Sequence, residues 1–294
     1  MRLCFFVVAL AALVLSLQAS PRAETIGVVL TDDVQMALGD AFLAEGEYYR
    51  AVTEYKKLTI LFPDSDRLPE ALYQMGMAYY RGEDYASAVA AFAGVRRTYA
   101  AAYFSRAAFY EGLSYSRLGR QEAAALAFER ARLFDETHPA AADAQLGLSL
   151  IALEQDDVSG CRAQLEAFQA NYPDDPRLSA VQSAFMLLNE YGAAPPKSPA
   201  LAGTLSALLP GAGQVYAEHY RDGAMAFIVN ALFIAGTVAA VDAGNYGLAA
   251  ITGGVGLPFY AGNIYGAANA ARKWNLSLKK TTMDQMALAL EFDY

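Results

Sequence analysis

One pattern recurs four times in the first half of the chain and limits what that half can fold into. Its clearest copy is Leu38–Pro63, LGDAFLAEGEYYRAVTEYKKLTILFP. Apolar residues fall at helical spacing on both sides of Gly46, so the stretch predicts two short helices joined by a turn, and Pro63 cannot continue the second helix. In each copy a small residue is expected where the paired helices approach, first a glycine and then an alanine or cysteine: Gly39 and Ala51, Gly76 and Ala88, Gly112 and Ala124, Gly147 and Cys161.

The four glycines lie at positions 39, 76, 112 and 147, so the period is 35 to 37 residues. This pattern resembles the tetratricopeptide repeat (TPR), a helical hairpin of about 34 residues that stacks into a solenoid. The alternative is a generic helical bundle with chance spacing, and four copies in phase argue against it. Stacked hairpins form a concave groove, so the resemblance implies that residues 24–192 bind a protein or peptide.

Two of the copies end in an aromatic-Pro-Asp corner, Phe62-Pro63-Asp64 and Tyr172-Pro173-Asp174. These corners are similar to those in TPR proteins of the bacterial envelope, such as the assembly lipoprotein BamD and the Tol-associated coordinators. The resemblance implies a periplasmic scaffold without catalysis. The lipid anchor of BamD is not matched, because Cys4 lies too early for a lipoprotein cysteine.

Residues 1–23 are typical of a Sec-type signal sequence, with Arg2 before an apolar run and small residues after it. An uncleaved N-terminal anchor is the alternative, and the cleavage site stays open. Removal of the signal would leave Cys161 as the only thiol, which excludes an intramolecular disulfide. We expect Cys161 to be a buried core residue.

Charge divides unevenly along the chain. Residues 1–193 carry 16 Lys and Arg against 25 Asp and Glu, whereas residues 194–294 carry 6 of each kind. The acidic repeat half disfavours nucleic acid and anionic lipid as partners, and a basic or apolar peptide suits it better. A solvated acidic outer face is the alternative explanation.

The last hundred residues differ in kind. A proline-rich linker, 193–199, precedes two long uncharged segments, 223–241 and 243–271. Each is long enough to span a bilayer core of about 30 Å, so residues 200–272 predict a membrane module with two helical segments, and a third is possible. A buried soluble hairpin is the alternative.

Small residues follow one face of the second segment. Gly262, Gly266 and Ala270 are spaced one turn apart and would let membrane helices pack closely. Asn230 and Asn263 could hydrogen-bond across that contact. Pro258 is expected to kink the segment. Residues 273–294 form a tail in which apolar residues alternate, but one strand cannot close a barrel, so we expect a helix or a disordered tail.

An uncharged stretch, 198–217, comes before the first of these segments. It resembles the opening of TM2-type membrane modules in seven residues: Ser206, Ala207, Pro210, Gly211, Gly213, Gln214 and Tyr216. Where that family has a glycine, this chain has Glu218. The resemblance implies membrane placement, and the Pro-Gly-x-Gly break indicates a re-entrant or interfacial helix, or an interrupted third span. With two spans, the tail would lie on the same side of the membrane as the repeats. With three spans, it would lie on the opposite side. We favour two spans or a re-entrant form.

The sequence contains no metal-ligand cluster, nucleophile elbow or complete phosphate loop, so we predict no enzyme and no cofactor. The expected fold is all-α, a TPR helical-hairpin solenoid followed by a helical membrane hairpin. The expected function is a membrane-tethered periplasmic scaffold of the bacterial cell envelope, on the inner membrane rather than the outer, which binds a partner in the groove and the bilayer through residues 200–272. The alternative is a small transport or pore accessory subunit whose membrane module is the active part.

Overall fold

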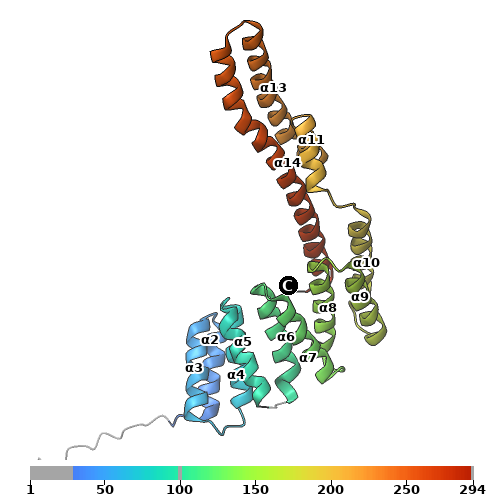
Figure 1. Cartoon of the computed structure of the whole chain (residues 1–294). Coiled ribbons are helices and arrows are strands. Elements are labelled where there is room, and N and C mark those ends of the chain that lie inside the picture. Colours follow the sequence, from blue (N-terminus) through green and yellow to red (C-terminus); the bar gives the residue numbers. More distant parts are fainter. Residues whose placement is uncertain (1–28, 99–100, 293–294) are drawn as a thin grey trace, which may run out of the picture.

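The computed structural model describes residues 29–98 and 101–292, and the predicted signal sequence lies outside them. Within the described residues every regular element is an α-helix, which confirms the all-α prediction. Figure 1 shows an array of helical hairpins from which a long helical arm projects.

The array consists of antiparallel helix pairs stacked side by side (Figure 1). The pairs are α2 (Asp32–Ala44) with α3 (Tyr48–Leu61), α4 (Leu68–Arg81) with α5 (Tyr85–Arg97), α6 (Ala101–Arg117) with α7 (Gln121–Phe134), and α8 (Pro139–Glu154) with α9 (Val158–Asn171). The first helices of successive pairs contact one another, whereas in the described part of the chain the second helices do not. The first helices therefore line the inner, concave side of the array.

Left-handed residues mark the turn inside each hairpin. They are Gly46, Glu83, Gly119 and Asp156, with φ angles of 78°, 62°, 70° and 62°. Glycine adopts this conformation without steric cost, and a residue with a Cβ does not. The turns fall 37, 36 and 37 residues apart, so the structural period is slightly longer and more regular than the spacing of the four glycines.

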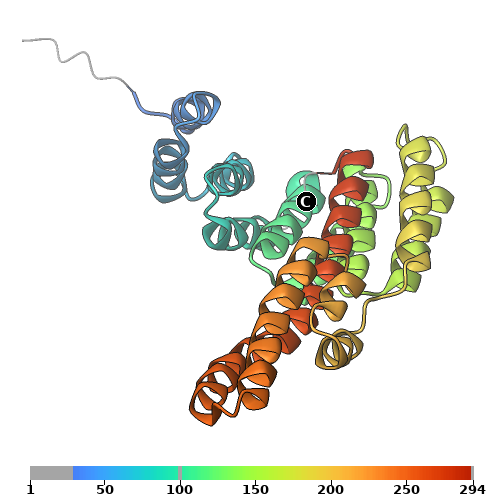
Figure 2. The same ribbon diagram turned by 90° about the horizontal axis from the view of Figure 1, so that it is seen from above.

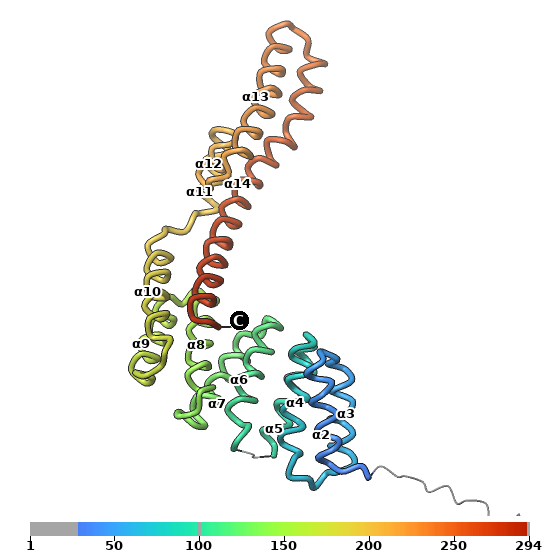
Figure 3. The backbone as a smooth tube through the Cα atoms, turned by 180° about the vertical axis from the view of Figure 1, so that it is seen from behind, coloured from blue at the N-terminus to red at the C-terminus, as the bar shows by residue number. Residues whose placement is uncertain are grey.

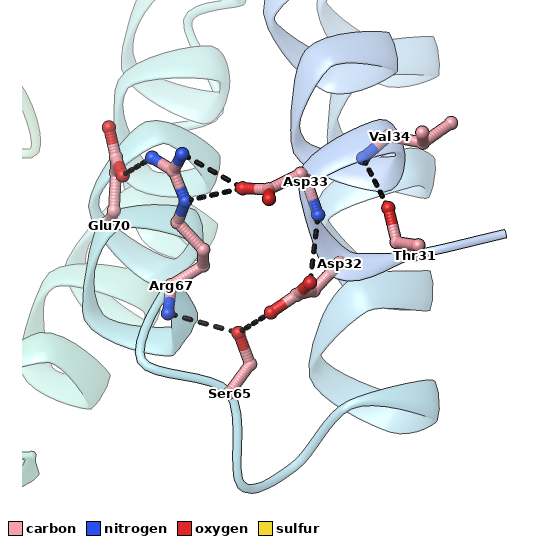
Figure 4. Close-up of polar contacts among 7 residues, drawn as sticks. All are labelled: Thr31, Asp32, Asp33, Val34, Ser65, Arg67 and Glu70. Atoms are coloured by element: carbon pink, nitrogen blue, oxygen red, sulfur yellow. Dashed lines mark hydrogen bonds and ion pairs between the residues drawn. The ribbon is translucent and has the colours of Figure 1, made fainter.

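Polar side chains join the start of a repeat to its end. Thr31 caps α2 by accepting a hydrogen bond from the Val34 amide at 3.2 Å. Figure 4 shows Arg67 reaching back to Asp33 at 2.9 Å and forward to Glu70 at 2.9 Å.

The second aromatic-Pro-Asp corner has the same arrangement. Arg177 contacts Asp143 at 2.6 Å, and its backbone amide donates to Asp175 at 2.8 Å, as the Arg67 amide does to Ser65 at 3.0 Å. In both corners the arginine lies 34 residues after its aspartate partner. The corner is therefore a clamp that closes one repeat unit on itself.

Beyond the repeats, α10 (Leu178–Ala193) packs on α9, and residues 194–198 lead to the arm. The arm contains α11 (Pro199–Leu208), α12 (Ala212–Tyr216), α13 (Tyr220–Asp242) and α14 (Tyr246–Ala289). Figure 3 shows α13 and α14 side by side as an antiparallel hairpin that points away from the repeats.

The helix α14 is longer than the sequence analysis expected. It runs for 44 residues, contains Pro258 without ending there, and crosses the expected boundary at residue 272. Because no glycine or proline occurs between residues 267 and 289, nothing in the tail stops the helix. Its end contacts α8 and α10, so the tail is part of the folded core and not a separate segment (Figure 2).

Candidate functional site: the repeat groove and the hairpin base

Close glycine contacts hold the two helices of each repeat together. A Cβ atom on Gly39, Gly76 or Gly112 would come within 2.4, 2.5 or 2.6 Å of the ring that lies sixteen residues later, which is Tyr55, Phe92 or Phe128. The small residues on the partner helices are fully buried: Ala51, Ala88, Ala124 and Cys161. Burial raises the pKa of the Cys161 thiol to about 12, so this cysteine is a packing residue and not a nucleophile.

Gly147 occupies a different place from the other three glycines. Its Cβ would meet Phe128 of the preceding repeat at 2.9 Å. The residue sixteen positions before Leu165 is Ser149, which is fully buried and donates its hydroxyl to the Leu146 carbonyl at 2.7 Å. Ser149 is therefore the fourth-repeat counterpart of Gly39, and Gly147 packs between repeats.

The concave side contains a hollow of about 320 Å³. Residues of α4 and α6 line most of it, namely Met77, Tyr80, Arg81, Phe109, Tyr110 and Leu113. Asp143 and Arg177 of the second corner clamp lie at its edge, and Phe292 closes one side. The hollow thus combines an aromatic floor with charged groups of both signs, which suits a peptide with apolar anchors.

Most repeat tyrosines are committed to packing. Tyr73 lies 5.6 Å from Tyr103 and 6.1 Å from Phe92 between ring centroids, and burial raises its pKa to about 12. Tyr80 and Tyr110 meet edge-to-face, with ring centroids 5.4 Å apart, and border the hollow. Only these two of the tyrosines in the α4–α6 cluster are placed to meet a partner in the hollow.

A buried carboxylate lies between α5, α6 and α7. Glu111 is 1% exposed and pairs with Arg96 at 2.8 Å and with Arg130 at 3.7 Å. Desolvation raises the pKa of Glu111, and the two arginines oppose that shift. Its partners are guanidinium groups, so it links three helices and has no group to exchange protons with.

The Pro-Gly-x-Gly motif forms the base of the arm. Gly211 adopts φ 88° and donates its amide to Asn263 Oδ1 at 3.0 Å. Gly213 donates to Ser206 Oγ at 2.9 Å, Ser206 donates to Gln214 Oε1 at 2.8 Å, and Gln214 Nε2 donates to the Asn263 carbonyl at 3.0 Å. The backbone groups freed by the break between α11 and α12 are thereby satisfied inside the protein.

Tyr216 and Glu218 complete this base. Lys197 lies over the rings of Tyr216 and Trp274, 5.2 and 4.8 Å from their centroids, and pairs with Glu218 at 3.0 Å. Glu218 has φ 66°, a left-handed conformation that glycine adopts without steric cost. Asn275 Oδ1 accepts from the Lys197 amide at 2.8 Å, which fixes the linker to α14.

The stripe Gly262, Gly266 and Ala270 does not form the contact that was expected of it. No atom lies within 4 Å of a Cβ placed on Gly262, while Gly266 would meet the Gln214 amide at 3.6 Å. Ala270 packs in a cluster with alanines of α11 and α14 and with Ala217, which directly follows α12. The close approach of α13 to α14 is at Gly256, whose Cβ would meet Phe233 at 2.9 Å.

The two asparagines also differ from expectation. Asn230 donates to the Ala226 carbonyl of its own helix at 2.8 Å, and Asn263 serves the motif, so neither bridges α13 and α14. Asn263 was not predicted as part of the motif site, because it lies about fifty residues further along the chain.

Helix α13 is the one described helix that is long and apolar enough to cross a membrane by length and composition. Only 11% of its most apolar window is buried. Across the described residues, no group of three or more His, Cys, Asp and Glu side chains lies close enough to hold a metal ion.

Comparison with known families covers the first two hairpins. Residues 33–65 and 70–101 match the tetratricopeptide repeat model. These two hairpins are therefore tetratricopeptide repeats, and repeats of this class serve as scaffolds for protein–protein interaction. Proteins with such repeats are usually not enzymes.

Two solved structures are similar to the chain at low identity. The apo form of RapI is 12% identical with a TM-score of 0.48, over 82% of this chain and 63% of RapI. A tetratricopeptide repeat protein from Parabacteroides merdae is 14% identical with a TM-score of 0.46, over 87% of this chain and 98% of its own. This chain thus spans less than two thirds of the length of RapI. No curated protein matches the chain.

Proposed function

We propose that the protein is a non-enzymatic scaffold that docks a partner polypeptide on its repeats and is tethered to a bacterial membrane by the hairpin of α13 and α14. The observation that carries the tether is the exposure of apolar residues on the arm. Leu232 and Leu257 are each 69% exposed and Ile251 is 65% exposed. Such exposed apolar side chains on two adjacent helices form an apolar surface that a bilayer would cover.

We infer a topology of two spans, in which α14 crosses the membrane beside α13, although by length and composition only α13 of the described helices could cross alone. Helix α11 has 10 residues, which is about 15 Å and half of a bilayer core. The end of α14 packs against α8 and α10, so the tail and the repeats belong on the same side of the membrane. Tyr216 and Trp274 beside Lys197 would mark the interface on that side, where aromatic and basic residues collect.

We further propose the periplasm for the repeats and the inner membrane for the hairpin. The predicted signal sequence and the similarity of the corners to envelope TPR proteins support this compartment. Arg272, Lys273 and Lys280 lie on the repeat side of a two-span hairpin, and the positive-inside tendency favours the cytoplasm for them. The two arguments oppose each other, so the side must be measured.

Thiol labelling of intact cells tests this topology. Cys4→Ala and Cys161→Ala remove the native thiols, and alanine suits position 161 because the other three repeats have it there. Single cysteines then replace exposed residues in the second corner, the hairpin tip and the tail: Asp174→Cys, Ala243→Cys and Ser277→Cys.

A membrane-impermeant maleimide should label the Asp174→Cys and Ser277→Cys variants and leave the Ala243→Cys variant unlabelled until the cells are permeabilised. Labelling of Ala243→Cys alone would keep two spans and move the repeats to the cytoplasm. Labelling of Asp174→Cys and Ala243→Cys without Ser277→Cys would mean three spans. Release of the protein by alkaline carbonate would refute the tether.

A further inference from the structure

The tail of α14 fills a site on the repeat array. Helix α10 contacts α9 but not α8, whereas each earlier first helix contacts the next along the inner side. The end of α14 contacts both α8 and α10 and so bridges the two helices. Met286 and Leu290 are fully buried there, with Met283 and Ala287 packed against the same core cluster.

Aromatic packing anchors the last described residue of the tail. The Phe292 ring meets Phe109 at 5.9 Å and Phe128 at 6.4 Å, nearly edge-on in both contacts. Phe128 is the ring that fits against Gly112 in the third repeat. The tail therefore reaches the core layer of the repeats and is not a loose surface contact.

A basic residue holds the other end of the tail. Lys279 Nζ donates to the Glu154 carbonyl at 3.0 Å and pairs with Asp156 at 2.9 Å. Glu154 is the last residue of α8, where the helix dipole favours a cation. Tyr191 of α10 donates to the same aspartate at 3.1 Å, so Asp156 links the lysine to α10.

The site therefore selects a definite kind of segment. Its occupant is an amphipathic helix with a basic residue, apolar residues four, seven and eleven positions later, and an aromatic residue two positions after the last of these: Lys279, Met283, Met286, Leu290 and Phe292. Phe292 also lines the hollow formed mostly by α4 and α6, so the site is continuous with that hollow along the inner side of the array.

We propose that this inner site is a helix-binding site, that the tail of α14 is its resident ligand, and that a partner protein docks by offering a helix of the same pattern in place of the tail. The site favours such a segment because Asp156 and the carbonyl end of α8 meet its basic residue, and the core cluster meets its apolar residues. Because α14 is one uninterrupted helix, displacement of the tail frees the hairpin from the repeats. The inference rests on the proposed function only in that the repeats bind polypeptides, and it does not require the membrane.

The test uses the full chain in detergent and a fluorescent synthetic peptide, LSLKKTTMDQMALALEF, which corresponds to residues 276–292. The wild-type protein should bind it weakly, because the tethered tail competes at an effective concentration of about 1 mM. Phe292→Ala weakens the tail, so peptide affinity by fluorescence anisotropy should rise about ten-fold or more.

Matched controls separate this effect from general loosening. Leu288 lies on the same turn and is 81% exposed, so Leu288→Ala should leave the peptide affinity within about two-fold of wild type. A peptide with serine in place of Leu290 and Phe292 should not bind. Should Phe292→Ala lose helical content, Lys279→Ala serves instead, since it removes only the contacts to Glu154 and Asp156, and a gain of about three-fold is expected.

Absence of peptide binding at ~100 µM to a folded tail variant would overturn the inference and make the tail a permanent part of the core. A wild-type dimer that exchanges its tails, seen by light scattering, would also overturn it, because a second copy would then be the occupant. If the peptide binds but carbonate releases the protein, only the membrane tether fails. If the protein stays in the membrane and no peptide binds, only this inference fails.

Discussion

The repeat array and the arm arrange polar and apolar residues in opposite ways. The largest fully buried side chains of the array include Tyr55, Phe92, Phe128 and Phe168. At the base of the arm polar side chains are buried beside alanines, with Ser206 at 0%, Gln214 at 5% and Asn263 at 6% exposure, while leucines on the hairpin face outwards. The array therefore has an apolar, aromatic core, whereas the arm buries polar groups and exposes leucines, and this second distribution is the basis of the proposed tether.

The glycines of the two regions also differ in what they pack against. In the array a Cβ on Gly39, Gly76 or Gly112 would meet an aromatic side chain, which can shift to some extent. At the base of the arm a Cβ on Gly213 would meet the Ala202 carbonyl oxygen at 1.9 Å, and backbone cannot yield in the same way. The arm therefore depends on close backbone contact, and the array on fitting rings against small residues.

The largest expected effect comes from Gly213→Ala. The added methyl group forces α11 away from α12, so we expect a loss of more than about 3 kcal/mol of stability in the arm. Thermal unfolding of the detergent-solubilised protein, followed by circular dichroism, measures it. Gly262→Ala is the matched control, since a Cβ there meets no atom within 4 Å and should change stability by less than about 0.5 kcal/mol. Equal losses for both variants would contradict the packing at the base.

The same substitution in the two regions should give opposite results. Leu232 of α13 and Leu126 of α7 are 69% and 60% exposed. If lipid surrounds the arm, Leu232→Arg places a charge in the bilayer at a cost of about 3 kcal/mol and lowers the carbonate-resistant fraction. Leu126→Arg faces water and should leave that fraction unchanged. A normal carbonate-resistant fraction for Leu232→Arg would mean that no bilayer covers this face.

The sequence predicts the array better than the arm, because the repeat pattern is local. Helix spacing, the turn at Gly46 and the close helix approach at Gly39, Gly76 and Gly112 follow from residues within about 34 positions of one another. The fourth repeat was misaligned by two residues because its close-contact position is Ser149, and the nearby Gly147 resembled the motif better. The left-handed turns at Glu83 and Asp156 were also not predicted, because glycine is the usual residue in that conformation and these two positions have none.

The remaining differences come from contacts distant in sequence. The sequence of residues 206–214 does not indicate that Asn263 accepts a hydrogen bond from this segment. The sequence of residues 279–292 likewise does not indicate that this segment packs against α8 and α10. In the tail, Met286, Leu288, Leu290 and Phe292 alternate, but only Leu288 of these is exposed. Helical spacing at 283, 286 and 290 was present as well, and it is the pattern that the tertiary contacts select.

Two asparagines of the arm should differ in their contribution to stability, because Asn263 bonds to another segment and Asn230 bonds within its own helix. Asn263→Ala leaves the Gly211 amide and the Ser206 carbonyl without their partner inside the base, which should cost about 2 kcal/mol. Asn230→Ala removes a bond to the Ala226 carbonyl of the same helix and should cost less than about 1 kcal/mol. Thermal unfolding in detergent compares them. A larger loss for Asn230→Ala would mean that Asn230, and not the motif, stabilises the arm.

The corner clamps give the smallest effect and compare two sites within the array. Arg177 is 19% exposed and contacts Asp143 and Asp175, whereas Arg67 is 46% exposed and its partner Asp33 is 71% exposed. Arg177→Ala should therefore cost about 1 kcal/mol, and Arg67→Ala about 0.5 kcal/mol or less because water screens it. Urea unfolding of the repeats at pH 7 measures both.

The pH dependence of that difference tests its electrostatic origin. The hydrogen bonds from Arg177 lower the pKa of the Asp175 carboxyl in the folded protein. A carboxyl whose folded pKa is lowered contributes stability above its unfolded pKa, near 3.9, and that stability is lost as the pH falls through the folded pKa. The gap between wild type and Arg177→Ala should thus be complete at pH 7 and narrow below about pH 4. A gap that stays constant down to pH 3 would mean that Arg177 acts through packing of its stem against Phe168, 5.6 Å from its guanidinium carbon, and not through its carboxylate partners.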